Sequence, residues 1–437
     1  DASSNEDSVI NGGGAAYANT TLTVYGEADA FDAGTTLTGG TGTDSLVISQ
    51  KATSGNATAK IDGDITGFEN ITVTDTAGNN TGGVTLDIND TAYATALTID
   101  TSALDAGEAD TIQAGNAAVA LTVTAGEGIS TIDTGTKADT ITSGGGNDVI
   151  NAQAGLDNIS AGAGNDAITA DTEADFLTTL GTDTVDGGAG TDSLTFSAAA
   201  TLTTSELVNI SNIETLNLTT GTTLTVNDAF FAANPGIVIK PGASSTINAS
   251  TATGDSLTTA LNVSANAAGN LSLLGGSGDD TFTFFATESL TVLDTVNGGT
   301  GDDQIIVDIV DANTYDYAGD NTTATLDVNV SGIETVKIKD LALDDGGGTG
   351  IVVTATVTVN AGFTGTALTI DGSDLDMHPT TLTGGERLTA DASNNAATEV
   401  VTLIGGAFSD SLTGGLAADT LTGNAGADSL QGGGGND

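Results

Sequence analysis

Aspartates recur at nine-residue intervals in two parts of this sequence, and an apolar residue follows nearly every one of them two positions later. The first run is Asp139, Asp148, Asp157 and Asp166, and the second is Asp410, Asp419, Asp428 and Asp437. Asp183 with Asp192 and Asp294 with Asp303 repeat the interval once, and Asp44 and Asp280 stand in single copies. A chain that coils with a matching period would bring these carboxylates together, where they could hold metal ions.

Glycines precede these aspartates in the pattern GGxGxD, at its first, second and fourth positions. Glycine takes positive φ at little cost because it lacks a Cβ, so each unit predicts a tight turn followed by a very short strand. We predict that these glycines form the ion sites together with the aspartates. The glycines concerned are Gly39, Gly40, Gly42, Gly144, Gly146, Gly162, Gly164, Gly188, Gly190, Gly276, Gly278, Gly299, Gly301, Gly426, Gly433 and Gly435.

Two nine-residue units make one coil, so turns on the same side should stack one coil apart. The predicted pairs are Asp139 with Asp157, Asp148 with Asp166, Asp410 with Asp428 and Asp419 with Asp437. Stacked carboxylates repel one another unless a cation lies between them. Calcium accepts six to eight oxygen ligands, backbone carbonyls included, whereas magnesium requires a stricter octahedron. Softer metals prefer His or Cys, and the chain has one His and no Cys. The pattern therefore predicts multiple Ca²⁺ ions.

The tandem GGxGxDxUx units resemble the RTX, or haemolysin-type, calcium-binding repeat. Strict repeats cover residues 134–169 and 405–437, and the pattern departs from the family at 152–157 and 414–419, where other residues replace some glycines. The resemblance implies a parallel β-roll and secretion by a one-step type I exporter of a Gram-negative bacterium into calcium-rich surroundings. The chain starts without Met and stops inside an unfinished repeat. We therefore expect the export signal to lie outside this sequence.

A longer cycle contains the nine-residue repeats. Each cycle has a Gly/Asp turn, a segment with a glutamate (Glu69, Glu214 or Glu334), a strand that ends in Asn, and a further strand. Three cycles in one order predict modules at 37–182, 183–293 and 294–404, between an N-terminal segment (1–36) and a terminal nonapeptide array (405–437). We expect an all-β fold, a parallel β-roll or right-handed β-helix solenoid. A string of β-sandwich domains is the alternative, but Asn-Gly hairpin signals are scarce.

Composition excludes several classes of partner. The chain has 437 residues, 58 acidic and 7 basic, for a formal net charge of −51. The few cations are scattered, which argues against nucleic acid and against anionic membrane surfaces. No apolar run approaches the roughly 20 residues of a membrane span, so we expect no direct membrane insertion.

The remaining residues give weaker signals. His378 lies next to Pro379, outside any recognisable catalytic motif, and we interpret it as structural. The repeated glutamates could be calcium ligands, an acid pair for glycan cleavage, or structural residues, and repetition favours a structural role. Asp110, Asp175 and Asp255 precede apolar residues but lack the glycines, so they are weak ligand candidates. Thr-x-Thr strings could form an ice-binding face, but their irregular spacing favours ordinary solvent-facing strands.

These observations favour a non-enzymatic function. The chain resembles the calcium-binding RTX-type surface-layer proteins of Gram-negative bacteria. The resemblance implies a secreted structural protein that folds in calcium and assembles with copies of itself in a lattice or filament, anchored to lipopolysaccharide or another surface glycan. Two alternatives remain open: an RTX adhesin or ice-binding stalk, and the calcium-binding domain of a larger secreted enzyme.

Overall fold

The computed structural model describes a large part of the chain. The described residues are 9–11, 21–26, 36–39, 42–50, 59–61, 65–75, 83–88, 95–170, 183–249, 260–265, 269–285, 290, 293–308, 323–326, 329–339, 354–359, 363, 367–375, 387–396 and 398–437. They form two compact units. Unit 1 comprises residues 1–200, 204–217 and 232–237, and unit 2 comprises 201–203, 218–231 and 238–437. The module boundaries expected from the repeat order remain a prediction.

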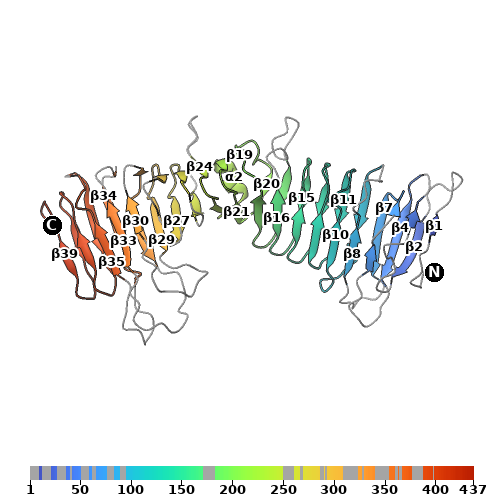
Figure 1. Cartoon of the computed structure of the whole chain (residues 1–437), viewed down its shortest axis with the longest axis horizontal. Coiled ribbons are helices and arrows are strands. Elements are labelled where there is room, and N and C mark those ends of the chain that lie inside the picture. The colour runs from blue at the N-terminus through green and yellow to red at the C-terminus, as the bar shows by residue number, and fades with distance from the viewer. Residues whose placement is uncertain are drawn as a thin grey trace. The chain divides into compact units, whose positions relative to one another are not determined.

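Unit 1 consists of parallel sheets whose neighbouring strands come from successive coils (Figure 1). The first sheet has the order β1 (Val9–Asn11), β3 (Thr36–Thr38), β6 (Ile65–Thr66). The second has the order β2 (Thr21–Gly26), β4 (Ser45–Gln50), β7 (Asn70–Asp75), β9 (Leu97–Asp100), β11 (Leu121–Thr124), β13 (Thr140–Thr142), β15 (Asn158–Ser160), β17 (Thr184–Asp186), β20 (Ile210–Ser211). The third has the order β5 (Ala59–Ile61), β8 (Val84–Asp87), β10 (Asp110–Gln113), β12 (Ser130–Asp133), β14 (Val149–Asn151), β16 (Ala167–Ala170), β18 (Ser193–Phe196), β21 (Thr215–Asn217).

Unit 2 is built in the same way. One row of strands has the order β23 (Val238–Lys240), β25 (Asn262–Ala265), β27 (Thr281–Phe285), β29 (Gln304–Asp308), β32 (Thr335–Lys339), β34 (Ala367–Asp371), β36 (Val400–Ile404), β38 (Thr420–Thr422). A second has the order β19 (Thr201–Leu202), β22 (Thr223–Thr225), β24 (Thr246–Asn248), β26 (Ser272–Leu274), β28 (Thr295–Asn297), β31 (Val330–Ser331). A third has the order β30 (Thr323–Leu326), β33 (Thr354–Val359), β35 (Arg387–Asp391), β37 (Ser411–Thr413), β39 (Ser429–Gln431).

These parallel coils confirm the predicted β-solenoid and do not fit β-sandwich domains, whose sheets are antiparallel. The segments expected to be strands in the longer cycle are strands, for example β7, β21 and β32 after the three glutamates. The described residues include one helix, α2 (Asp228–Ala233). None of the described helical residues forms a segment long and apolar enough to cross a membrane.

Side chains alternate between an inward and an outward face along each strand. In β12, Ser130 and Ile132 are buried whereas Thr131 is exposed. Register carries the inward residues into continuous rows: Ile132 pairs with Ile150, and Ile150 pairs with Ile168. Each of these three isoleucines is at most 1% exposed. Full burial of such a side chain stabilises the fold by about 1.5–3 kcal/mol.

The coils keep their register although their lengths differ. Strand β13 pairs with β15, and β15 pairs with β17, without a change of phase. The aspartates that precede these strands are 18 residues apart in the first step and 26 in the second. The extra residues are therefore accommodated between strands, and the side-chain rows continue unbroken.

Candidate metal centre

The aspartates of the nonapeptide turns lie on the inward face, at the residue before a strand. Their side chains are buried even though each carries a carboxylate: Asp148 is 1% exposed, Asp166 2% and Asp192 0%. The same inward row elsewhere contains leucines, such as Leu97 and Leu121. A carboxylate thus occupies a position that would otherwise belong to the hydrophobic core, where an uncompensated charge is costly.

Successive aspartates are joined by hydrogen bonds from one coil to the next. The backbone N–H of each aspartate donates to Oδ1 of the aspartate in the following coil, and we call such a run a carboxylate ladder. The N···O distances are 2.7–3.0 Å for Asp139 to Asp157, Asp148 to Asp166, Asp157 to Asp183, Asp166 to Asp192, Asp280 to Asp303, Asp410 to Asp428 and Asp419 to Asp437. The four pairs expected from the 18-residue offset are therefore adjacent.

Ladders start at residues that are not acidic. The N–H groups of the preceding coil come from Leu121 for Asp139, Ser130 for Asp148, Leu261 for Asp280, Leu271 for Asp294, Leu388 for Asp410 and Val401 for Asp419. A ladder is thus a bounded run within a row that is otherwise mostly apolar.

The second carboxylate oxygen distinguishes two kinds of turn. Among the described residues, Oδ2 of Asp166, Asp192 and Asp303 is buried and has no hydrogen-bond partner. We call the turns that contain these aspartates open turns. In the turns of Asp280, Asp410 and Asp419, Oδ2 accepts the N–H of the second-position glycine at 2.6–2.9 Å. We call these capped turns.

Backbone conformation separates the two kinds. The second-position glycines of the open turns have positive φ: 99° at Gly162, 95° at Gly188 and 104° at Gly299. The fourth-position glycines Gly164, Gly190 and Gly301 also have positive φ. The three glycines that donate in the capped turns, Gly276, Gly406 and Gly415, are not among the described residues with positive φ. The orientation of one peptide group therefore decides whether Oδ2 receives an N–H.

The other glycines of the pattern have three outcomes. Gly42, Gly144, Gly146, Gly426, Gly433 and Gly435 have positive φ as expected. Gly278 does not share this conformation, and Gly40 lies outside the described residues. We expected first-position glycines to be needed for positive φ. This was wrong, because Gly39 and Gly187 have no positive φ. A Cβ at these positions would lie 1.8 Å from the carbonyl oxygen of Gly67 and 2.0 Å from that of Asn212. Close packing between coils, rather than φ, requires glycine there.

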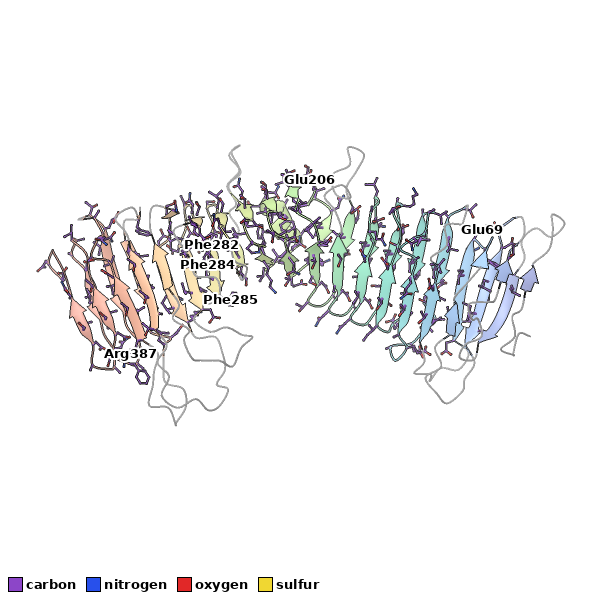
Figure 2. The ribbon with its side chains drawn as sticks, viewed as in Figure 1. Glu69, Glu206, Phe282, Phe284, Phe285 and Arg387 are labelled. Atoms are coloured by element: carbon purple, nitrogen blue, oxygen red, sulfur yellow. The ribbon has the colours of Figure 1, made fainter. Side chains whose placement is uncertain are left out.

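The three repeated glutamates occupy ladder positions that the sequence did not reveal. Glu69 Oε2 accepts the N–H of Asp44 at 2.7 Å, and Glu69 immediately precedes β7 (Figure 2). Glu214 accepts the N–H of Asp192 at 2.6 Å, and Glu334 that of Asp303 at 2.8 Å. Each glutamate therefore takes the place of the next aspartate. In the structure, each glutamate follows a residue with positive φ by two positions: Gly67, Asn212 or Gly332.

Other weak candidates have different outcomes. Asp110 lies in register with Ser130, and the hydroxyl of Thr101 donates to its Oδ2. Glu108 was not predicted, and it is 1% exposed, with Oε2 accepting the N–H of Asp105 at 2.9 Å. Burial raises the pKa of both Glu108 and Asp110. Asp175, Asp255 and His378 lie outside the described residues.

Burial also raises the pKa values of the ladder carboxyls. The pKa rises to about 6 at Asp139, Asp148, Asp192 and Asp303, chiefly through desolvation. Neighbouring carboxylates add to the rise: Asp166 and Glu214 act on Asp192. Burial raises the pKa of Asp166, Asp280 and Asp410 as well. The ladders are therefore built to favour either protons or a compensating cation.

These features fit calcium. The described residues contain no cluster of three or more His, Cys, Asp and Glu side chains that could bind a metal alone. In the open turns at Gly187 and Gly298, a Cβ would lie within 3 Å of both the aspartate Oδ2 and a carbonyl oxygen of the next coil. Carboxylate and carbonyl oxygens are the ligands that calcium prefers.

Comparison with known families agrees with this geometry. Residues 124–159, 144–177, 160–194 and 404–437 match the model of the RTX calcium-binding nonapeptide repeat. Residues 36–82 match the model of the bacterial antifreeze protein repeat. No curated protein and no solved structure matches the chain. RTX proteins are typically secreted. The chain thus carries RTX nonapeptide repeats, which bind calcium at multiple sites, in both of its compact units.

Proposed function

We propose that this chain is a secreted structural protein that folds in calcium outside the cell and assembles there with copies of itself, as a surface layer or an extracellular filament. The observation that carries the proposal is the buried, unpartnered Oδ2 of Asp166, Asp192 and Asp303 within the described residues. A buried carboxylate without a compensating charge opposes folding. The fold of these coils should therefore depend on a cation.

Folding and export are then controlled by the same carboxylates. The net charge of −51 keeps the chain expanded where calcium is scarce, as it is inside cells. Calcium bound in the turns would supply the positive charge that the ladders lack. Because the turns do not exist in the unfolded chain, the binding free energy contributes directly to folding.

Assembly is proposed to use the outward faces of the coils, which carry hydroxyl and carboxylate side chains. Thr140, Thr142 and Asp186 are examples in one sheet of unit 1. Calcium shared between such carboxylates on neighbouring copies would give a lattice or filament that also depends on the ion. Lipopolysaccharide or another anionic surface glycan is the anchor that we propose, through the same bridging.

Electron microscopy of the purified chain tests assembly. We expect ordered two-dimensional arrays or filaments with calcium, and dispersed particles with equimolar magnesium. Circular dichroism in the same samples reports folding separately. Folded single particles at every protein concentration in calcium would contradict the assembly proposal while leaving calcium-dependent folding intact.

Ice binding is a second candidate, favoured by two observations. Residues 36–82 match the antifreeze repeat. In addition, outward threonines are in register despite irregular spacing in the sequence: Thr98 pairs with Thr122 and Thr122 with Thr140. Ice recrystallisation inhibition by the calcium-loaded chain tests this candidate. Loss of inhibition in Thr122→Tyr, with an unchanged circular dichroism spectrum, would support a threonine ice-binding face.

A further inference from the structure

Three segments end in the ladder glutamates, and we call residues 67–69, 212–214 and 332–334 the Glu turns. We propose that the Glu turns at 212–214 and 332–334 each complete an additional calcium site with the aspartate turn of the preceding coil. These sites have GGxGxD on one side only, and neither Glu turn lies within the residues that match the RTX repeat. The inference rests on calcium binding by the neighbouring turns, as proposed above.

Register places the glutamates where an aspartate ligand would lie. Thr215 pairs with Ser193 and Thr335 with Gln304, so Glu214 is opposite Asp192 and Glu334 is opposite Asp303. The backbone N–H of each glutamate also donates to the carbonyl of its partner aspartate at 3.0 Å. Main chain and side chain therefore both hold the Glu turn against the aspartate turn.

A backbone carbonyl from each Glu turn approaches the open aspartate. A Cβ at Gly187 would lie 2.0 Å from the carbonyl oxygen of Asn212 and 2.9 Å from Asp192 Oδ2. At Gly298 the matching distances are 2.0 Å to the carbonyl oxygen of Gly332 and 2.4 Å to Asp303 Oδ2. The carbonyl oxygen and the aspartate Oδ2 therefore lie near the same point beside each glycine. The turns at Gly405 and Gly414 bring an aspartate Oδ2 and a carbonyl oxygen together in the same way, although their Oδ2 also accepts an N–H.

The open carboxylates provide an independent indication of a ligand. Asp192 is 0% exposed and Asp303 is 1% exposed, and Oδ2 of each has no hydrogen-bond partner among the described residues. Further negative charge surrounds them, because Asp166 and Asp186 act on Asp192, and Asp279 and Asp280 act on Asp303. A divalent cation between the carbonyl and the two carboxylates would compensate the open Oδ2 and reduce the repulsion from these neighbouring charges.

The Glu turns also mark where carboxylate ladders stop. Thr369 pairs with Thr335, which places Leu368, a buried residue, opposite Glu334 in the next coil. The ladder Asp280–Asp303–Glu334 is therefore bounded by Leu261 at its start and by Leu368 at its end. The glutamate contributes the final carboxylate for the last ion of the ladder.

Counting bound calcium on the whole chain tests the inference. The double variant Glu214→Gln/Glu334→Gln keeps an oxygen to accept the aspartate N–H but removes both charges. We expect native mass spectrometry and calorimetry to show two fewer ions than in the unaltered chain, or two sites weakened at least tenfold. Glu399→Gln is the matched control, because Glu399 accepts a backbone N–H from Ala396, outside any ladder. This control should leave the count unchanged.

An unchanged number and affinity of ions in the double variant would overturn the inference. Absence of calcium binding by the unaltered chain would instead refute the function proposed above. If the double variant does not fold, anomalous scattering from calcium-loaded crystals of the unaltered chain decides the question. A peak bordered by Asp192, Asn212 and Glu214 is expected, and filled RTX turns beside an empty Glu turn would refute the site.

Discussion

Turns 162–166 and 187–192 in unit 1 differ from turns 405–410 and 414–419 in unit 2, although all end in a ladder aspartate. In unit 1 the second-position glycines Gly162 and Gly188 have positive φ, and the aspartate Oδ2 has no partner among the described residues. In unit 2 the N–H groups of Gly406 and Gly415 donate to that oxygen. The buried Oδ2 of a ladder aspartate is therefore compensated in one of two ways, by an external cation or by an internal N–H group.

This difference predicts that calcium dependence is not uniform along the chain. A capped turn satisfies its buried oxygen from its own backbone, so its coil can close without an ion. An open turn leaves the same oxygen uncompensated, so its coil is stable only when a cation or a proton is present. Residues 152–157 and 414–419 depart similarly from the glycine pattern, yet only the second is capped by its second-position N–H.

Removing calcium should produce the largest difference in stability between the open-turn and capped-turn regions. In excess chelator we expect loss of β-structure, and hydrogen exchange should show that amides of residues 158–170 and 183–194 lose protection before those of 401–413. Each site held at 100 times its dissociation constant stabilises the fold by about 2.7 kcal/mol. Several open sites together should therefore exceed the stability of their coils. An unchanged spectrum, or equal loss of protection in both regions, would show that open and capped turns do not differ in how much calcium stabilises them.

Acidification should partly replace calcium in the open turns. The pKa of Asp192 and Asp303 is about 6 in the fold, against 3.8 ordinarily, so the folded chain binds more protons than the unfolded chain. Their contribution to metal-free stability is complete below about pH 3.8 and is lost as pH rises through about 6. Metal-free protein should thus regain β-structure between pH 7 and pH 5 in circular dichroism. A steady loss of structure over that range would contradict this prediction.

Replacing a ladder aspartate by asparagine should change the free energy of unfolding without calcium in opposite directions in open and capped turns. In Asp166→Asn, the remaining oxygen still accepts the N–H of Asp148. We expect a loss of about 1.5–3 kcal/mol in calcium and a gain in chelator, because an uncompensated buried charge disappears. In Asp419→Asn, an amide NH₂ can face the N–H of Gly415, which should destabilise the fold in both conditions. Urea unfolding with and without calcium measures both variants, and equal signs would remove the distinction.

First-position residues should give the smallest effect. Gly187→Ala places a Cβ 2.0 Å from the carbonyl of Asn212, whereas the equivalent Ala161 is already accommodated and buried. We expect Gly187→Ala to lower the free energy of unfolding in calcium by about 1–3 kcal/mol through overpacking. Ala161→Gly, the matched control, should cost about 0.5–1 kcal/mol through chain entropy. Thermal unfolding in calcium compares them, and a neutral Gly187→Ala would show that the coils are not tightly packed there.

Sequence periodicity predicted those parts of the molecule that depend on fixed spacing. The nine-residue interval gave the solenoid and the adjacency of Asp139 with Asp157 and of Asp148 with Asp166, because constant coil length fixes register. Coils of unequal length concealed the ladder positions of Glu69, Glu214 and Glu334, which follow their partner aspartates by 25, 22 and 31 residues. Only strand pairing reveals such matches.

The state of each turn could not be predicted from the sequence. Residues 275–280 have the full GGxGxD pattern, yet the N–H of Gly276 caps Asp280, whereas the same pattern at 298–303 leaves Asp303 open. The difference lies in the orientation of a peptide group, which glycine permits in either form. Identical residues therefore give two environments for one carboxylate.

The inward row before the strands accepts leucine in some coils and a carboxylate in others, at one and the same register. Leu97 and Asp139 thus fill the same buried position in different coils, one with an apolar side chain and the other with a carboxylate that needs a compensating charge. Exchanging aspartate for leucine at this position, one coil at a time, would change how strongly the stability of the solenoid depends on calcium. That dependence would be graded rather than all or none.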